Sequence, residues 1–183
     1  MSRLTTFDPA QATGETRELL DATQRTFGVI PNTAKILASS PAALKTWLES
    51  IRALAAGQLD PGLRERIALG VAETNGCEYC LSGHTYVAKH MAHLSDQAIE
   101  ESRRLSSADP KVDAALSFTR AVLETRGGVS DADVEQVRAA GYSDGEIAEI
   151  IAHVALNVLT NYFNKVADTE VDFPRVALAV RAA

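Results

Sequence analysis

Helix-start signals recur along almost the whole chain, and they constrain the fold more than any other feature. A capping residue directly precedes a proline at Asp8-Pro9, Ser40-Pro41, Asp60-Pro61 and Asp109-Pro110. Aspartate and serine side chains accept hydrogen bonds from the free N–H groups of a first helical turn, and proline suits the first helical position because that residue needs no internal donor. Each pair therefore predicts the start of a helix.

Further signals complete the pattern. Ser143 and Glu146 have the spacing of a capping box. Glycines 57, 127, 128 and 141 fall where helices are expected to stop. No segment combines period-two alternation with β-branched residues, so no strand is predicted. We expect helices over residues 9–26, 32–39, 41–56, 61–74, 77–93, 95–105, 110–126, 130–139 and 143–167, and a short helix is possible after Pro174. The prediction is an all-α chain, a single compact multi-helix domain over residues 1–183.

Composition narrows the class of protein. Apolar residues make up 46% of the 183 residues, which is enough for a sizeable core, and the formal net charge is −6. Without a basic run, a nucleic-acid partner has no electrostatic support. No apolar run approaches about 18 residues, so neither a transmembrane helix nor a membrane partner is expected. The first eight residues lack the apolar core of a signal peptide, which predicts a cytoplasmic protein.

The only two cysteines lie three residues apart, as Cys77 and Cys80, and His84 follows four residues later. On a helix these offsets place all three side chains on one face. A C-x-x-C pair can cycle between dithiol and disulfide, and a histidine one turn away can accept a thiol proton. Asn75-Gly76 interrupts the helical pattern, so Cys77 is expected at a helix N-terminus, where the dipole lowers a thiol pKa.

Two other interpretations of the cysteines remain open. They can be inert core residues, because free cysteine is commonly buried. They can also bind zinc with His84, although this gives only three ligands, and His90 and His93 point to the other side of the helix and are expected at the surface.

The preceding helix carries two candidate acids. Glu65 shares its angular sector with alanine and leucine side chains and is expected to point into the protein, where a carboxylate needs a partner such as a histidine. Glu73 falls on the side of Arg66, where a solvated ion pair explains it. Glu65 is therefore preferred as the functional acid.

Polar residues also recur on the last long helix, at three- and four-residue steps: His153, Asn157, Thr160, Asn161 and Asn164. A solvated face is the simplest explanation. A subunit interface or one wall of an active cavity are the alternatives.

The segment from Arg64-Glu65 through Asn75-Gly76-Cys77-Glu78-Tyr79-Cys80 to His84 resembles the signature of the AhpD-like alkylhydroperoxidase branch of the carboxymuconolactone decarboxylase superfamily. Looser similarity to peroxidase-related members lies in residues 27–32, 161–164 and 172–174. The resemblance implies an all-helical fold that assembles as trimers or hexamers. It also implies a peroxidase in which Cys80 attacks the hydroperoxide, Cys77 resolves the sulfenic acid as a disulfide, and His84 and Glu65 relay the proton.

The implied partners are a hydroperoxide substrate and a dithiol reductant protein of the lipoyl or thioredoxin-like kind. No phosphate-binding glycine loop occurs, so no cofactor is indicated. AhpD itself has a histidine directly before the second cysteine, where this chain has Tyr79, which cannot act as a base at neutral pH but can donate a hydrogen bond. A non-catalytic, redox-responsive oligomer and a carboxymuconolactone decarboxylase-like enzyme are the alternative functions.

Overall fold

The computed structural model describes residues 2–179, and within this range all regular structure is helical. After a single turn of 3₁₀-helix at Pro9–Gln11, the helices are α1 (Gly14–Phe27), α2 (Asn32–Leu37), α3 (Pro41–Ala55), α4 (Pro61–Thr74), α5 (Glu78–His90), α6 (Asp96–Arg103), α7 (Pro110–Thr125), α8 (Asp131–Ala139) and α9 (Asp144–Ala167). The all-α prediction is confirmed. The expected helix 9–26 is divided into the 3₁₀ turn and α1, and the other expected helices are present with ends that differ by a few residues.

The capping residues act as the sequence predicts. Ser40 and Asp60 accept hydrogen bonds from backbone N–H groups in the first turns of α3 and α4, each with proline at the first helical position. The predicted capping box of Ser143 and Glu146 opens α9. The possible helix after Pro174 is wrong as far as residue 179, because this segment runs without helical hydrogen bonds; residues 180–183 lie outside the described range.

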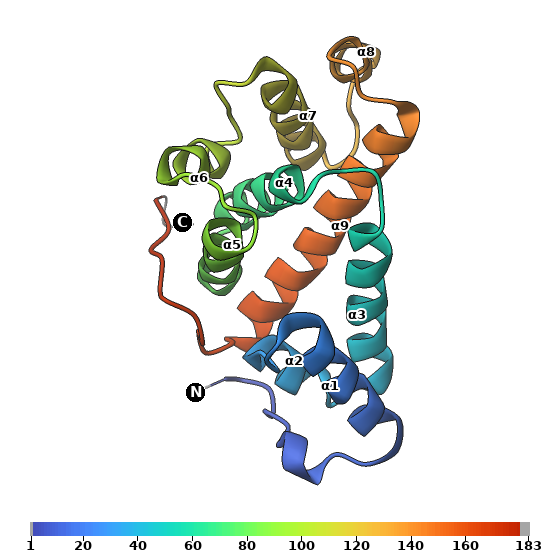
Figure 1. Cartoon of the computed structure of the whole chain (residues 1–183), viewed down its shortest axis with the longest axis vertical. Coiled ribbons are helices and arrows are strands. Elements are labelled where there is room, and N and C mark those ends of the chain that lie inside the picture. The colour runs from blue at the N-terminus through green and yellow to red at the C-terminus, as the bar shows by residue number, and fades with distance from the viewer. Residues whose placement is uncertain (1, 180–183) are drawn as a thin grey trace.

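Helix α4 lies at the centre of the fold and packs against α5, α6, α7 and α9. Its residues from Ile67 to Ala72 are all buried, because neighbouring helices surround this part of α4. Figure 1 shows α9 running obliquely between α4 and α5 on one side and α3 on the other. Helices α4, α5 and α9 therefore form the frame in which any site on the cysteine helix is built.

Apolar side chains gather in three clusters. One joins α4 to α7, α8 and α9, and a second joins α1, α2 and α3. The third surrounds the two cysteines, and the segment after α9 packs against it through Val171, Phe173, Val176 and Leu178. Figure 1 shows this segment running along α5 toward the C-terminus. Among the described helices, none is long and apolar enough to cross a membrane.

Candidate functional site

The cysteine pair begins helix α5. Gly76 adopts a positive φ of 64°, a conformation that favours glycine, and turns the chain from α4 into α5. Cys77 is the N-cap of α5, and its sulfur accepts a hydrogen bond from the backbone N–H of Cys80 at 3.3 Å. The predicted place of Cys77 at a helix N-terminus is confirmed. Both cysteines are free thiols, and only 1% of Cys77 and 5% of Cys80 is exposed.

The predicted histidine partner of Glu65 is present. Nδ1 of His84, on α5, lies 2.9 Å from a carboxylate oxygen of Glu65, on α4. The side chain of His84 is 30% exposed and that of Glu65 is 18% exposed. Burial lowers the pKa of His84, but the charge of Glu65 and its hydrogen bond outweigh burial, and the net effect is a raised pKa.

The pKa values of the two thiols are ordered opposite to the dipole expectation. Burial raises the pKa of Cys80, but hydrogen bonds from Cys77 and Asn164, together with the positive charge of His84, lower it to about 7. The pKa of Cys77 is raised, because its hydrogen bond to Cys80 keeps its proton in place and because it is itself buried. The lowering of the Cys77 pKa expected from the helix dipole is therefore outweighed by burial and by the hydrogen bond to Cys80.

The positive charge of His84 favours the thiolate form of Cys80. Among the described side chains no hydrogen bond joins the imidazole directly to the sulfur, whereas Asn164 Nδ2 lies 3.4 Å from Cys80 Sγ. A proton moving from this thiol to His84 therefore needs a bridging water or a substrate oxygen between them.

The polar stripe of α9 faces the cysteines and the histidine. His153, Asn157, Asn161 and Asn164 are all buried, so the simplest sequence interpretation, a solvated face, is wrong. Asn164 and Asn161 favour the charged form of Cys80, and Asn157 favours that of His84. Burial and the nearby Arg64 lower the pKa of His153 to about 4, which keeps this imidazole neutral at neutral pH. The stripe is one wall of the site.

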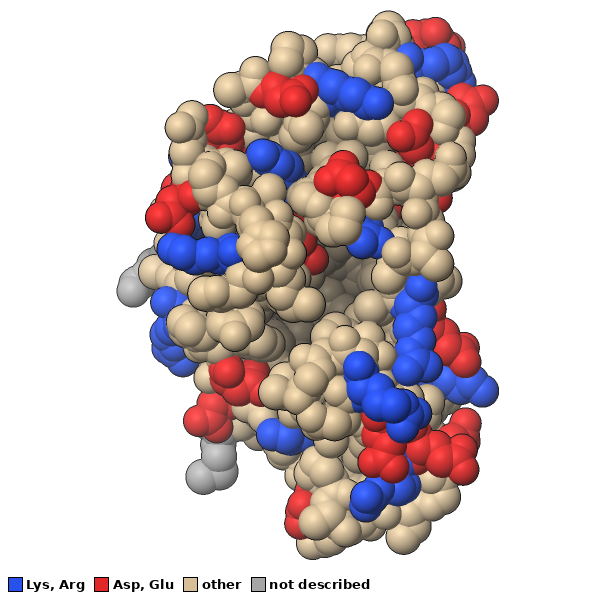
Figure 2. Space-filling view, in the orientation of Figure 1, with Lys and Arg blue, Asp and Glu red and all other residues tan. Residues whose placement is uncertain are grey.

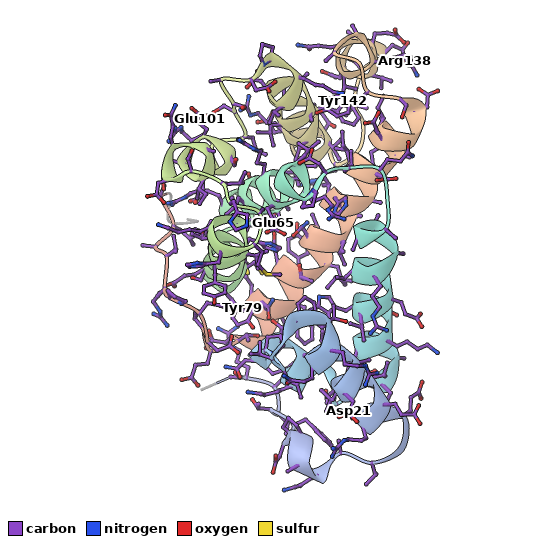
Figure 3. The ribbon with its side chains drawn as sticks, viewed as in Figure 1. Asp21, Glu65, Tyr79, Glu101, Arg138 and Tyr142 are labelled. Carbon is purple, nitrogen blue, oxygen red and sulfur yellow. The ribbon has the colours of Figure 1, made fainter. Side chains whose placement is uncertain are left out.

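Tyr79 faces away from the histidine–glutamate pair. Its hydroxyl oxygen accepts a hydrogen bond from the backbone N–H of Thr33, at the start of α2, at 3.2 Å. Its ring packs edge-on against Phe173 of the segment after α9, with centroids 5.8 Å apart. Figure 3 shows Glu65 at the end of α5 nearer α4 and Tyr79 at the end nearer α2. Tyr79 therefore ties the cysteine helix to α2.

Glu73 does not form the predicted solvated pair with Arg66. It pairs with Arg103 of α6 at 2.8 Å, and the two side chains are only 9% and 10% exposed. Its other oxygen accepts a hydrogen bond from the backbone N–H of Ala179. The partner comes from a helix thirty residues along the chain, which helix periodicity around α4 alone does not reveal. Glu73 thus anchors the C-terminal segment.

His90 and His93 are exposed, as predicted. Within residues 2–179, no group of three or more histidine, cysteine, aspartate or glutamate side chains is arranged to hold a metal ion. In particular, Cys77, Cys80 and His84 do not converge on one point.

Sequence reasoning missed two residues that shape the site. Thr33 donates its hydroxyl hydrogen to the side-chain oxygen of Asn164 at 2.7 Å, and Asn75 donates its amide to the side-chain oxygen of Asn161 at 2.9 Å. Asn75 is visible in the sequence only as a helix-ending residue, and Thr33 carries no signal of its own.

A hollow in the molecular surface leads toward this region. On the face shown in Figure 2, acidic and basic side chains are mixed, and the surface is hollowed near its centre, between the regions of α5 and α3. Glu65 lies on the α5 side of that region (Figure 3). The partial exposure of Glu65 and His84 is consistent with solvent reaching them, while both sulfurs stay covered.

Fold and site together define a class: an all-helical protein with a buried thiol pair beside a histidine–glutamate ion pair. The model of the carboxymuconolactone decarboxylase family matches residues 41–125, a segment that holds Glu65, Cys77, Cys80 and His84 but ends before α9. Among curated protein sequences, none matches the chain at a significant level.

Solved structures share the fold over nearly the whole chain. An uncharacterized peroxidase-related protein from Ralstonia eutropha JMP134, described as an alkylhydroperoxidase AhpD core, has a TM-score of 0.82 at 24% identity, covering 93% of this chain and 92% of that one. A peroxidase-related protein from Silicibacter sp. TM1040 has a TM-score of 0.77 at 24% identity, covering 92% of each chain. The debrominase Bmp8 in complex with 2,3,4-tribromopyrrole has a TM-score of 0.79 at 18% identity, covering 94% of this chain and 92% of that one.

These likenesses show the fold, and the family match covers the segment that carries the cysteines. The cysteine-bearing segment, residues 41–125, is therefore similar to the carboxymuconolactone decarboxylase family, and the chain has the fold of AhpD-like structures.

Proposed function

We propose that the protein is a thiol-dependent peroxidase that reduces hydroperoxides through a Cys77–Cys80 disulfide cycle. The family match and the peroxidase-related structural neighbours indicate an antioxidant, peroxidase-type enzyme. The observation that carries the finer proposal is the environment of Cys80, a buried thiol whose pKa is lowered to about 7 beside the His84–Glu65 pair. A thiol that ionises near neutral pH is the form that attacks a peroxide oxygen.

The cycle begins when Cys80 loses its proton to His84, whose protonated form the Glu65 carboxylate stabilises. The thiolate attacks one oxygen of the hydroperoxide; an S–O bond forms, the O–O bond breaks, and the alkoxide leaves as an alcohol after taking the proton from His84. Cys80 is now a sulfenic acid.

Cys77 resolves this intermediate. Its sulfur attacks Cys80, the S–S bond forms, and the hydroxyl leaves as water with the proton of the Cys77 thiol. The raised pKa of Cys77 is consistent with its staying protonated until this step. A dithiol donor, such as a lipoyl or thioredoxin-like protein, then reduces the disulfide and is itself oxidised.

The test measures hydroperoxide consumption with dihydrolipoamide as electron donor. We expect multiple turnovers with the parent protein, none with Cys80→Ser, and a trapped Cys80 sulfenic acid, detected by mass spectrometry, with Cys77→Ser. His84→Asn is expected to lose most of the activity. His90→Asn is the matched control, because His90 lies exposed on the same helix, and it should leave activity unchanged.

Three outcomes would contradict the proposal. Equal turnover by Cys80→Ser removes the attacking role of that sulfur. A single stoichiometric oxidation with a change in size-exclusion behaviour favours a redox-responsive assembly instead. Bromide release from 2,3,4-tribromopyrrole without peroxide turnover indicates chemistry like that of the debrominase neighbour. The trimer or hexamer is a separate proposal, tested by sedimentation equilibrium.

A further inference from the structure

Two side-chain amides of α9 face the sulfur of Cys80. Asn161 is fully buried and Asn164 is 4% exposed, and both lie on the face of α9 that packs against α5. Nδ2 of Asn164 is 3.4 Å from Cys80 Sγ, within hydrogen-bond range for a sulfur acceptor. The side chain of Asn161, one turn earlier, also favours the charged form of this sulfur. One amide donor therefore contacts the thiol, and a second lies one turn earlier on the same helix.

Other residues fix the direction in which each amide points. The hydroxyl of Thr33 donates to Oδ1 of Asn164 at 2.7 Å, and the amide of Asn75 donates to Oδ1 of Asn161 at 2.9 Å. Because each side-chain oxygen is occupied by a donor, the NH₂ end of each amide is turned away from that donor, and that of Asn164 points to the sulfur. Thr33 comes from α2 and Asn75 from the turn before α5, so three separate parts of the chain set the orientation.

The arrangement is incomplete around a neutral thiol. Nδ2 of Asn161 has no hydrogen-bond partner among the described residues, although the atom is buried. An unpaired buried donor lowers stability, and proteins rarely leave one without reason. A neutral thiol is a weak acceptor, whereas a thiolate accepts strong charge-assisted hydrogen bonds. The two donors therefore match an anionic sulfur better than the protonated one.

We propose that Asn161 and Asn164 form an anion hole for Cys80, in which two preoriented amide groups hold the negative charge of that sulfur. Neither residue lies in the segment that the family model matches. Asn164 contacts the reacting atom and is a catalytic residue, and Asn161 supplies the second donor once the sulfur is charged. Thr33 and Asn75 are positioning residues that act through the two amides. The role in peroxide reduction rests on the proposed function, but the stabilisation of the thiolate does not.

The inference explains how a buried thiol ionises at all. Burial opposes ionisation, because a charge is less stable in an apolar interior than in water, and only 5% of Cys80 is exposed. Fixed dipoles directed at the charge replace the water that burial removes, and they need no rearrangement when the charge forms. The proton released from the sulfur can reach the His84–Glu65 pair through a water that bridges the two groups.

The experiment measures the ionisation of Cys80 without any peroxide. In a Cys77→Ser background, only one sulfur titrates, and the ultraviolet absorbance of the thiolate is followed against pH. We expect Asn164→Leu, which is close in size but has no donor, to raise the pKa of Cys80 by about one pH unit, and Asn164→Asp to raise it further because a carboxylate repels the thiolate. Asn161→Leu should shift it in the same direction.

Thr160→Val is the control on the same helix, since its hydroxyl bonds only to carbonyls of α9 itself. A second pair separates positioning from packing: Thr33→Val should raise the pKa of Cys80, and Thr33→Ser, which keeps the hydroxyl, should restore the parent value. This pair also keeps the proposal testable if an asparagine variant does not fold.

The proposal is overturned if the asparagine variants fold and titrate like the parent, or if Thr33→Val and Thr33→Ser behave alike. Loss of peroxidase activity with an unchanged pKa also overturns it. If the predicted shifts occur but no variant, nor the parent, turns over peroxide, the anion hole stands and the proposed function fails.

Discussion

The carboxylate of Glu65 and the imidazole of His84 lie 2.9 Å apart, although the two residues are nineteen positions apart and belong to different helices. The pair forms because α4 and α5 pack side by side, which brings the inward-facing acid of one helix beside the cysteine face of the other. Cys80 lies on that same face, one helical turn before His84, so the three side chains follow one another from the buried sulfur to the partly exposed carboxylate.

The first prediction concerns the pH dependence of stability. The folded pKa of His84 is raised above its usual value of about 6.5, so the ion pair stabilises the fold fully below that value, and this stabilisation is lost as the pH rises through the folded pKa. Glu65→Gln should therefore lower the free energy of unfolding more at about pH 5.5 than at about pH 8.5.

Urea unfolding at both pH values measures this difference, and NMR titration should show a lower His84 pKa in the variant. Glu49→Gln, at an exposed position of α3, serves as the control and should change neither quantity. An equal loss of stability at the two pH values would mean that the bond joins neutral groups.

The second prediction concerns which thiol reacts first with an alkylating reagent. In Cys77→Ser, the rate of modification of Cys80 should rise with a midpoint below the usual thiol pKa of about 8.5, because Asn164 and the charge of His84 still favour the thiolate. In Cys80→Ser, the remaining Cys77 should react only at a more alkaline pH, because burial still favours its thiol form. Mass spectrometry after timed alkylation identifies the modified residue. If Cys77 were the faster of the two, the roles proposed for the sulfurs would have to be exchanged.

The third prediction concerns the buried ion pair of Glu73 and Arg103. Removing one partner leaves the other charge buried and unpaired, so Arg103→Met should lower the free energy of unfolding by about 3 kcal/mol. Arg103 also donates to the carbonyl of Ala177, so the variant should release the C-terminal segment and speed its hydrogen exchange. Arg104→Met is the control, since that side chain is 64% exposed and should cost less than about 0.5 kcal/mol. A loss for Arg103→Met no larger than that of the control would show that the pair contributes little.

Local chemistry is why so much of the fold follows from the sequence. Caps such as Ser40 and Asp60 act on N–H groups two or three residues away, so the signal and its effect lie in one short segment. The buried character of α4 is equally readable, because nearly every face of that helix is apolar. The Glu65–His84 pair could be inferred for a related reason: an inward-facing carboxylate requires a partner, and a histidine stood on the neighbouring helix.

The predictions that were wrong concern contacts between segments that are distant in the sequence. Glu73 pairs with Arg103, a partner that neither helix periodicity nor sequence proximity indicates. The sequence shows that Cys77 begins a helix, and the dipole of that helix suggests a lowered Cys77 pKa. It does not show that α9 places Asn164 against Cys80, which lowers the pKa of Cys80 instead. For the same reason, the sequence alone suggests that the polar stripe of α9 faces solvent, because it does not show that this helix packs against α4 and α5.

The fourth prediction concerns Gly70, in the middle of α4, where two physical effects have opposite signs. Helix propensity alone predicts that Gly70→Ala stabilises the protein by about 1 kcal/mol. A Cβ there, however, would overlap the side chain of Leu105 and lie 2.9 Å from the backbone carbonyl oxygen of Ser102, which cannot swing aside. Because α6 approaches α4 this closely, we expect a net loss of about 1–3 kcal/mol.

Gly145→Ala is the matched comparison, because a Cβ at that helical position meets only the end of the Gln58 side chain, which can rotate away. That variant should be neutral or slightly more stable. Thermal and urea unfolding of the two variants test this prediction. If Gly70→Ala is as stable as Gly145→Ala, α6 can move away from α4 at little cost. The packing around the helix that carries Glu65 is then looser than the structure indicates.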